Sequence, residues 1–297
     1  MGAKASQRNY RRPELPDLSR KLSGPGHIRD ASRTYPFERA VHRGLMRKGL
    51  PSMIPLLVRA RLAAGIAHAA PWGITLDGLL AAQVWVDRKA ELIASDRYTS
   101  RALQQEDPPD IELPLARCTT SGEQWHWAAT CAFPENVDPR VQVHTWTGRV
   151  DRRDLEQVAT SLPKVVSERQ GRFRARCMPL LVTACNAVTW HAVGDPDAIR
   201  QLLDPVRSIG KKRTSGEGHV LGWEVTEVPA LDVFAAGHLH PNGSLGRPTP
   251  VGCLPAEWSG VDGGVGATGL RPPYMHRSRR HQLRLPALLG DAEVAPA

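Results

Sequence analysis

The stretch GDPDAIRQLLDPVRSIGKKRTSGEGHVLGWEV, Gly194–Val225, contains a short helix, a glycine-rich basic loop and a strand in that order. Asp195 is a typical N-cap residue and Pro196 suits a first helical turn, so a helix is predicted over 196–203. The alternating run at 219–227 predicts the strand that follows. A helix that leads through a loop into a last strand is the second half of a βαββαβ unit.

The first half of such a unit is predicted upstream. The apolar run at 53–63 has the composition of a strand, and Pro71 and Gly73 indicate a turn after it. Thr75 can then cap a helix over 76–94. The apolar side of this helix is predicted to consist of Leu76, Leu79, Leu80, Val84 and Val86.

The middle of the chain supplies the remaining strands. The segments 123–133 and 140–150 alternate, and they predict two strands joined by a turn at 134–139. Residues 172–195 are long enough for two strands or one bent strand. We therefore predict an α+β protein with a ferredoxin-like (RRM-like) βαββαβ antiparallel sheet with insertions.

Composition divides the chain into three parts: a basic Arg/Pro/Gly-rich arm at 1–50, the ferredoxin-like domain at 51–229 and an irregular Pro/Gly-rich extension with a basic tail at 230–297. The arm holds twelve Lys and Arg against four acids, an excess of eight in a chain whose net charge is +9. Such an arm is either mobile until it is ordered by a partner, RNA or a neighbouring subunit, or simply a solvated tail.

The five cysteines include no CxxC pair, and we interpret them as reduced thiols in a cytoplasmic protein. No secretory signal and no apolar run of about 18 residues is found, so no membrane association is expected. His238 and His240 hint at a metal, but no third ligand at a suitable spacing follows. We therefore predict neither a metal nor a cofactor.

The basic loop at 210–218 has two interpretations. It is not an ATP phosphate loop, because that motif follows a strand and precedes a helix, and G-x-x-x-x-G-K-[ST] is absent. It is either a solvent-facing hairpin or a clamp for a nucleic-acid backbone, since glycines allow close approach and cations neutralise phosphates. The clamp would use Gly210, Lys211, Lys212, Arg213, Gly216, Gly218 and the adjacent His219.

Two further basic patches favour the clamp. Arg172, Arg174 and Arg176 alternate, which would place them on one face of a strand. Near the C-terminus, cations are mixed with rings, a combination that suits single-stranded RNA because its exposed bases stack on rings. The residues of this second patch are Tyr274, His276, Arg277, Arg279 and Arg280.

Three pieces carry a resemblance to a known family: GIAHAAPWGITLDGLLA after the first strand, the helix–loop–strand stretch that ends at Val225, and the terminal RPPYMHRSRRHQLRLP. They resemble the RAMP superfamily of CRISPR-associated proteins, and more narrowly the subunit that caps the crRNA five-prime handle in type IV CRISPR effector complexes. The resemblance implies a non-catalytic crRNA-binding protein whose partners are the repeated backbone RAMP subunit and the large subunit. Target DNA near the five-prime end is a further partner that this hypothesis allows.

Some RAMP relatives cut pre-crRNA with a histidine, so a metal-independent endoribonuclease is the alternative function. His219 is the first candidate for this role because it follows the loop, whereas His126 and His191 lie in strand patterns and are expected to be structural. The chain offers no serine, cysteine or aspartate nucleophile motif. A third hypothesis is a basic nucleic-acid-binding protein outside CRISPR systems.

Overall fold

The computed structural model describes residues 53–287 apart from 69, 71, 97–107, 138–141, 149, 163–164, 168, 172 and 214–215. The described residues all belong to the second of the chain's two units, Tyr35–Ala297. The predicted arm at 1–50 therefore lies outside the described residues. Within them, no helix is long and apolar enough to cross a membrane.

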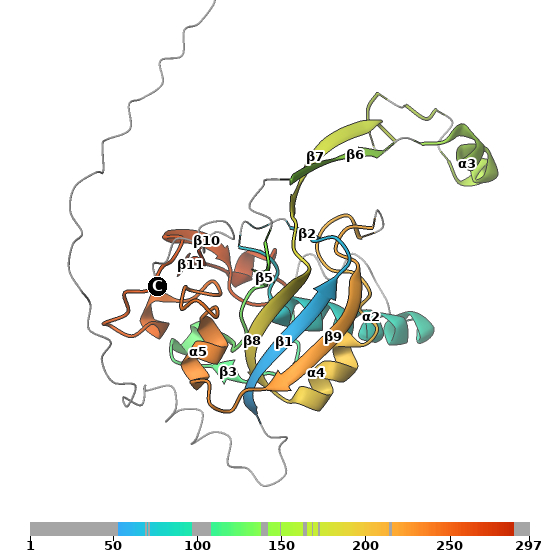
Figure 1. The fold of residues 1–297 in the computed structure, drawn as a ribbon. Helices are drawn as coiled ribbons and strands as arrows, with labels where there is room; N and C mark the ends of the chain where they lie inside the picture. Colours follow the sequence, from blue (N-terminus) through green and yellow to red (C-terminus); the bar gives the residue numbers. More distant parts are fainter. Residues whose placement is uncertain are drawn as a thin grey trace, which may run out of the picture. The chain divides into compact units, whose positions relative to one another are not determined.

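A four-stranded antiparallel sheet forms the centre of the second unit. Its strands are β1 (Ile54–Leu62), β5 (Phe133–Glu135), β8 (Ala187–Gly194) and β9 (Val220–Glu227), in the order β5-β8-β1-β9. β1 pairs with β8 along one edge and with β9 along the other. The predicted first and last strands thus lie side by side in one sheet (Figure 1).

Two helices begin where the sequence predicts. In α2 (Leu76–Ala94), the Thr75 hydroxyl accepts a hydrogen bond from the Gly78 amide at 3.2 Å. In α4 (Pro196–Leu203), the Asp195 carboxylate accepts from the amides of Asp197 and Ala198. These caps satisfy amide groups that have no partner inside the helix.

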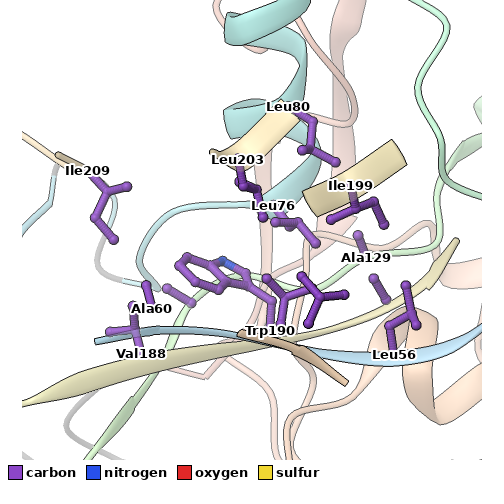
Figure 2. Close-up of a cluster of buried hydrophobic side chains, with 14 of the residues drawn as sticks. Leu56, Ala60, Leu76, Leu80, Ala129, Val188, Trp190, Ile199, Leu203 and Ile209 are labelled. Carbon is purple, nitrogen blue, oxygen red and sulfur yellow. The ribbon is translucent and has the colours of Figure 1, made fainter. Parts of the chain in front are cut away.

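Both helices cover the same face of the sheet. Side chains that alternate along β1 and β8, such as Leu56 and Trp190, point toward apolar residues of α2 and α4 (Figure 2). The helix residues include Leu76, Leu80, Ile199 and Leu203, all fully buried. Val86, which the sequence assigns to this apolar side, is instead 57 % exposed because the second half of α2 extends beyond the sheet core.

Trp190 lies at the middle of this core. It is 1 % exposed, and its indole N–H donates to the Ile74 carbonyl at 2.8 Å, just before α2 begins. Its ring packs against that of Trp223 on β9, with 5.8 Å between centroids. Trp223 in turn donates its indole N–H to the Val206 carbonyl at 2.9 Å, where the chain leaves α4. The indole pair therefore links both helices to the sheet.

A second antiparallel sheet has the order β2-β7-β6, formed by β2 (Ile66–Ala67), β7 (Arg176–Thr183) and β6 (Gln142–Gly148). Between β6 and β7 lie α3 (Arg152–Gln157) and a 3₁₀ turn, η3 (Ala159–Ser161). The region 172–195 thus forms two strands, β7 and β8, which belong to different sheets.

Of the two strands predicted at 123–133 and 140–150, the second is confirmed as β6, whereas the first is not a single strand and the two segments are not joined by a turn. The first segment contains the 3₁₀ turn η2 (Gly122–Gln124) and β4 (His126–Trp127), which pairs with β3 (Arg117–Cys118). It then follows the edge of β8 through the isolated bridge Ala129–Ala192 into β5, while β6 pairs with β7. Alternation identified residues that fit a sheet, but the pairing partners are distant in sequence and alternation does not specify them.

The segment after Pro229 is more ordered than the sequence predicts. It forms α5 (Val233–His238), β10 (Val265–Gly269), β11 (Arg280–Arg284) and the 3₁₀ turns η5 (Val251–Cys253) and η6 (Arg277–Arg279). Phe234 of α5 packs with Val193 of β8. Val193 and Trp190 are an odd number of positions apart on this strand, so their side chains point to opposite faces of the sheet. The segment therefore covers the sheet face opposite α2 and α4.

A buried charge holds this C-terminal segment in place. Arg247 is fully buried, and its guanidinium donates to the carbonyls of Trp127, Ala129 and Leu270. The same group lies 3.7 Å from the carboxylate of Asp77 in the first turn of α2. Arg247 thus connects three segments, and its charge is compensated by a partner that is equally buried.

We predict that Leu203→Ala lowers the free energy of unfolding by about 2–5 kcal/mol, because it truncates a fully buried side chain of α4 in the core cluster that α4 shares with α2 and β8. Chemical denaturation would measure the change. The matched control is Leu221→Ala, since Leu221 is 58 % exposed on β9 and its truncation should cost less than about 0.5 kcal/mol. Equal losses in the two variants would contradict this description of the core.

Candidate nucleic-acid interface

The basic loop connects α4 to β9 and has a closed base. Ser208 and His219 form a β-bridge, and the Ile209 amide donates to the Gly218 carbonyl at 2.9 Å. At the next position away from the loop tip, the Val220 amide donates to the Arg207 carbonyl at 2.9 Å. These bonds hold the two ends of the loop together, so its tip extends from an ordered stem.

Two of the three glycines face the protein's own backbone. A Cβ on Gly218 would lie 1.9 Å from the Ile209 carbonyl oxygen, and one on Gly210 would lie 2.2 Å from that of Ala67. The Lys211 amide donates to the same Ala67 oxygen at 2.7 Å, which fastens the loop to β2. Gly216 has open space around it. All three are predicted from the sequence to contact the ligand. Gly210 and Gly218 are in addition required by the fold of the loop itself.

The three cations of the loop differ in environment. Lys211 and Arg213 are exposed. Lys212 is half-buried and has a φ of +57°, a left-handed conformation that costs an L-residue about 1–2 kcal/mol. Its ammonium lies 3.1 Å from the centroid of the Trp146 ring on β6, a cation–π contact that offsets this strain.

The same face of the β6–β7 hairpin carries further polar groups. His144 Nδ1 lies 2.8 Å from the Glu217 carboxylate of the loop. Trp146 pairs with Met178, and the next pair on that face is Gly148 with Arg176. Because directly paired residues share a face, Arg176 lies on the loop-facing side of the hairpin. His144, Trp146, Lys212 and Glu217 line a pocket between hairpin and loop.

His68, which follows β2 beside the loop, is tied into the fold. Its Nδ1 lies 2.6 Å from the Ala70 carbonyl and its Nε2 lies 3.1 Å from the Thr183 hydroxyl. Burial lowers the pKa of His68, and the charge of Lys211 lowers it further. His68 is therefore neutral near pH 7 and adds no positive charge to the loop.

The predicted arginine stripe is only partly a strand. Arg172 lies outside the described residues, Arg174 precedes β7, and Arg176 is the first residue of β7. Both Arg174 and Arg176 are exposed. Arg174 and Arg176 do not lie on one strand as predicted, because β7 begins only at Arg176.

The C-terminal patch belongs to another part of the fold. Tyr274 donates its hydroxyl to Asp77 at 2.6 Å, and burial together with that carboxylate raises the pKa of Tyr274 well above its usual value. Arg279 is 7 % exposed, donates to the Pro108 carbonyl and pairs with Asp110 at 2.8 Å. These two side chains therefore serve packing.

The other members of this patch are more accessible. His276 is half-buried, and its ring accepts a hydrogen bond from the Ser278 amide at the start of η6. Arg277 and Arg280 are exposed, and Arg280 donates to the Ala267 carbonyl at 3.2 Å. Arg277 and Arg280 are thus the cations of this patch that remain open to a ligand.

His144 and Trp146 are neighbours of the loop that the sequence did not predict. Their alternation on one strand face was a usable signal, but their contact with the loop is a long-range one. A buried group of four was also not predicted: Cys118, His126, His238 and Cys253, whose side-chain ligand atoms lie within 4.8 Å of one another. The prediction of no metal site followed from spacing alone, and these residues lie far apart in sequence.

A comparison with protein families identifies the chain. The family model described as CRISPR type IV associated protein Csf3 matches residues 54–286. The chain belongs to the Csf3 family. This match confirms the predicted relationship to type IV CRISPR systems, and it covers the sheet, the basic loop and the C-terminal segment. No curated protein matches the sequence.

We predict that Gly218→Ala destabilises this Csf3-family protein more than Gly216→Ala does. Both glycines have positive φ, of +64° and +90°, so both substitutions introduce backbone strain. Only Gly218→Ala adds a clash with the Ile209 carbonyl. Thermal unfolding would show the larger drop in Tm for Gly218→Ala. Equal drops in Tm would mean that the loop stem accommodates the Cβ at position 218 without loss of stability.

Proposed function

We propose that the chain is a non-catalytic RNA-binding subunit of a type IV CRISPR effector complex, and that it holds the repeat-derived five-prime handle of the crRNA. The observation that carries this proposal is the loop at 210–218, whose exposed cations extend from an ordered stem beside the Trp146 face of β6. Membership of the Csf3 family supports the assignment to such a complex.

We also propose that the core is a ferredoxin-like domain of the RAMP type. In chain order, β1, α2, β5, β8, α4 and β9 follow the pattern βαββαβ. In the sheet order β5-β8-β1-β9, the first strand of the unit, β1, lies between its third strand, β8, and its last strand, β9. Both helices lie on one face of this sheet. On this view β2, β3, β4, β6 and β7 belong to insertions.

The chemistry of the loop suits a single-stranded RNA backbone. Lys211 and Arg213 are exposed and form no ion pair with any described residue, so their charges are available to phosphates. Lys212 is held against Trp146, and Arg176 continues the positive charge along the hairpin. Cations placed beside a ring and an open strand face favour an unpaired strand over a duplex.

The partners that this role requires are the crRNA, the repeated backbone subunit and the large subunit of the same complex. The complex would work in the cytoplasm, where crRNA is made and used. The basic arm at 1–50 is the part of the chain best suited to a second polyanionic contact, because it holds most of the net charge.

We predict that the double variant Lys211→Ala/Arg213→Ala binds handle RNA with a weaker salt dependence. Each phosphate contact that is lost reduces the log–log salt slope by about 0.7 for a single strand, so the slope should fall by up to about 1.4. Filter-binding titrations at several salt concentrations would measure it.

The matched control removes two exposed cations elsewhere, with Arg88→Ala and Arg200→Ala on α2 and α4. This control should keep the wild-type slope within error. An unchanged slope in the loop variant would contradict the clamp and direct attention to Arg176, Arg277 and Arg280.

A specific observation keeps the endoribonuclease as a second candidate. His144 and Glu217 form a 2.8 Å pair in the same pocket as Lys212, and the exposed His219 closes the loop stem. A histidine next to a carboxylate and a cation is a usable arrangement for general acid–base cleavage of RNA.

We predict that purified protein binds labelled repeat RNA and leaves it intact without added metal. Denaturing gels after prolonged incubation would reveal any product. Cleavage at one repeat position that is lost in His144→Ala or His219→Ala would replace the binding proposal with the nuclease. Cleavage that persists in both variants would point to a contaminating nuclease, and therefore both variants belong in the first experiment.

A further inference from the structure

Four metal-binding side chains converge away from the basic loop. Cys118 ends β3 and His126 begins β4, and the two are directly paired across that short hairpin. His238 is the last residue of α5 and Cys253 is the last residue of η5. Two ligands from a hairpin and two from the C-terminal segment thus meet through the tertiary fold.

The separations of the ligand atoms match a small central ion. The two Sγ atoms are 3.2 Å apart, the two Nε2 atoms are 3.0 Å apart, and Cys253 Sγ lies 3.5 Å from His238 Nε2. A tetrahedral ion with Zn–S of about 2.3 Å and Zn–N of about 2.0 Å separates two sulfurs by about 3.8 Å and two nitrogens by about 3.3 Å. Small side-chain rotations bring the group to these values.

The histidine rings are oriented as metal ligands. His238 Nδ1 lies 2.9 Å from the Phe234 carbonyl, and His126 Nδ1 lies 3.4 Å from that of Gln124. A carbonyl only accepts, so Nδ1 of each ring is the donor and each Nε2 presents a lone pair to the centre. Two lone pairs that face each other at 3.0 Å repel, and a cation between them turns this repulsion into two bonds.

The surroundings exclude water and competing ligands. Cys118, His126 and His238 are fully buried, and Cys253 is 6 % exposed. Apolar residues such as Ala116, Ala128 and Val193 enclose the group, and the Phe234 ring stacks on His238 with 4.5 Å between centroids. All four ligands come from the protein, which is the arrangement of a structural site with no open position for a substrate.

We propose that Cys118, His126, His238 and Cys253 bind a structural Zn²⁺ ion. Two thiolates and two neutral imidazoles in a tetrahedral group favour zinc over magnesium or calcium, which prefer oxygen. The two thiolates balance the charge of the ion, so the buried site is neutral. The ion would fasten α5 and η5 to the β3–β4 hairpin and close the C-terminal segment over the sheet.

The test uses the full chain purified without chelator. Elemental analysis should find one zinc per chain in the wild type and in Cys177→Ser, the control variant, because Cys177 is exposed on β7. Zinc should be lost from the double variant Cys118→Ser/Cys253→Ser. Removal of zinc by a chelator should lower Tm in the wild type and in the control.

A second measurement does not depend on the folding of a variant. Wild-type protein reconstituted with Co²⁺ should show the intense visible absorption of a tetrahedral thiolate site, and added Zn²⁺ should abolish it. A wild type that purifies with less than stoichiometric zinc and takes up neither ion would overturn the proposal. So would a Cys118–Cys253 disulfide detected by mass spectrometry in freshly purified protein.

Discussion

The contact between the tilted indole rings of Trp190 and Trp223 is the interaction on which the basic loop depends. The Trp190 indole is hydrogen-bonded to the backbone just before α2, and the Trp223 indole is hydrogen-bonded to the backbone just after α4. Because the rings pack against each other, the entrance to one helix and the exit from the other are held over the same sheet. The stem of the loop begins at this exit, so its direction is set by the core.

A rigid stem with an exposed tip is a useful design for a backbone contact. The cost of ordering the loop is met during folding by hydrogen bonds at Ile209, Lys211 and Val220. In the proposed role, a nucleic acid would meet cations on a preformed loop, and less conformational entropy would be lost on binding. The strained Lys212 fits this description, since its contact with Trp146 links the loop to the β6–β7 hairpin.

The C-terminal segment is attached by buried polar groups as well as by apolar contacts. Arg247 reaches carbonyls on two segments and the carboxylate of Asp77, which also accepts from Tyr274. Arg279 connects η6 to Asp110 in a similar way. Such buried polar contacts specify one arrangement, because any other arrangement leaves a charge without a partner. A Zn²⁺ ion bound by the Cys and His group would likewise hold the C-terminal segment in one arrangement.

The sequence by itself determined the features whose causes are local. Spacing and residue type account for the caps at Thr75 and Asp195, the two main helices and the strands at 54–62 and 220–227. The three quoted stretches together indicated the right family. Only the tertiary structure decided which strands pair, that Tyr274 and Arg279 are used inside the fold, and that Cys118 and Cys253 meet from 135 residues apart. Backbone propensity acts over a few residues, whereas pairing, burial and ligand convergence depend on contacts between segments that periodicity does not relate.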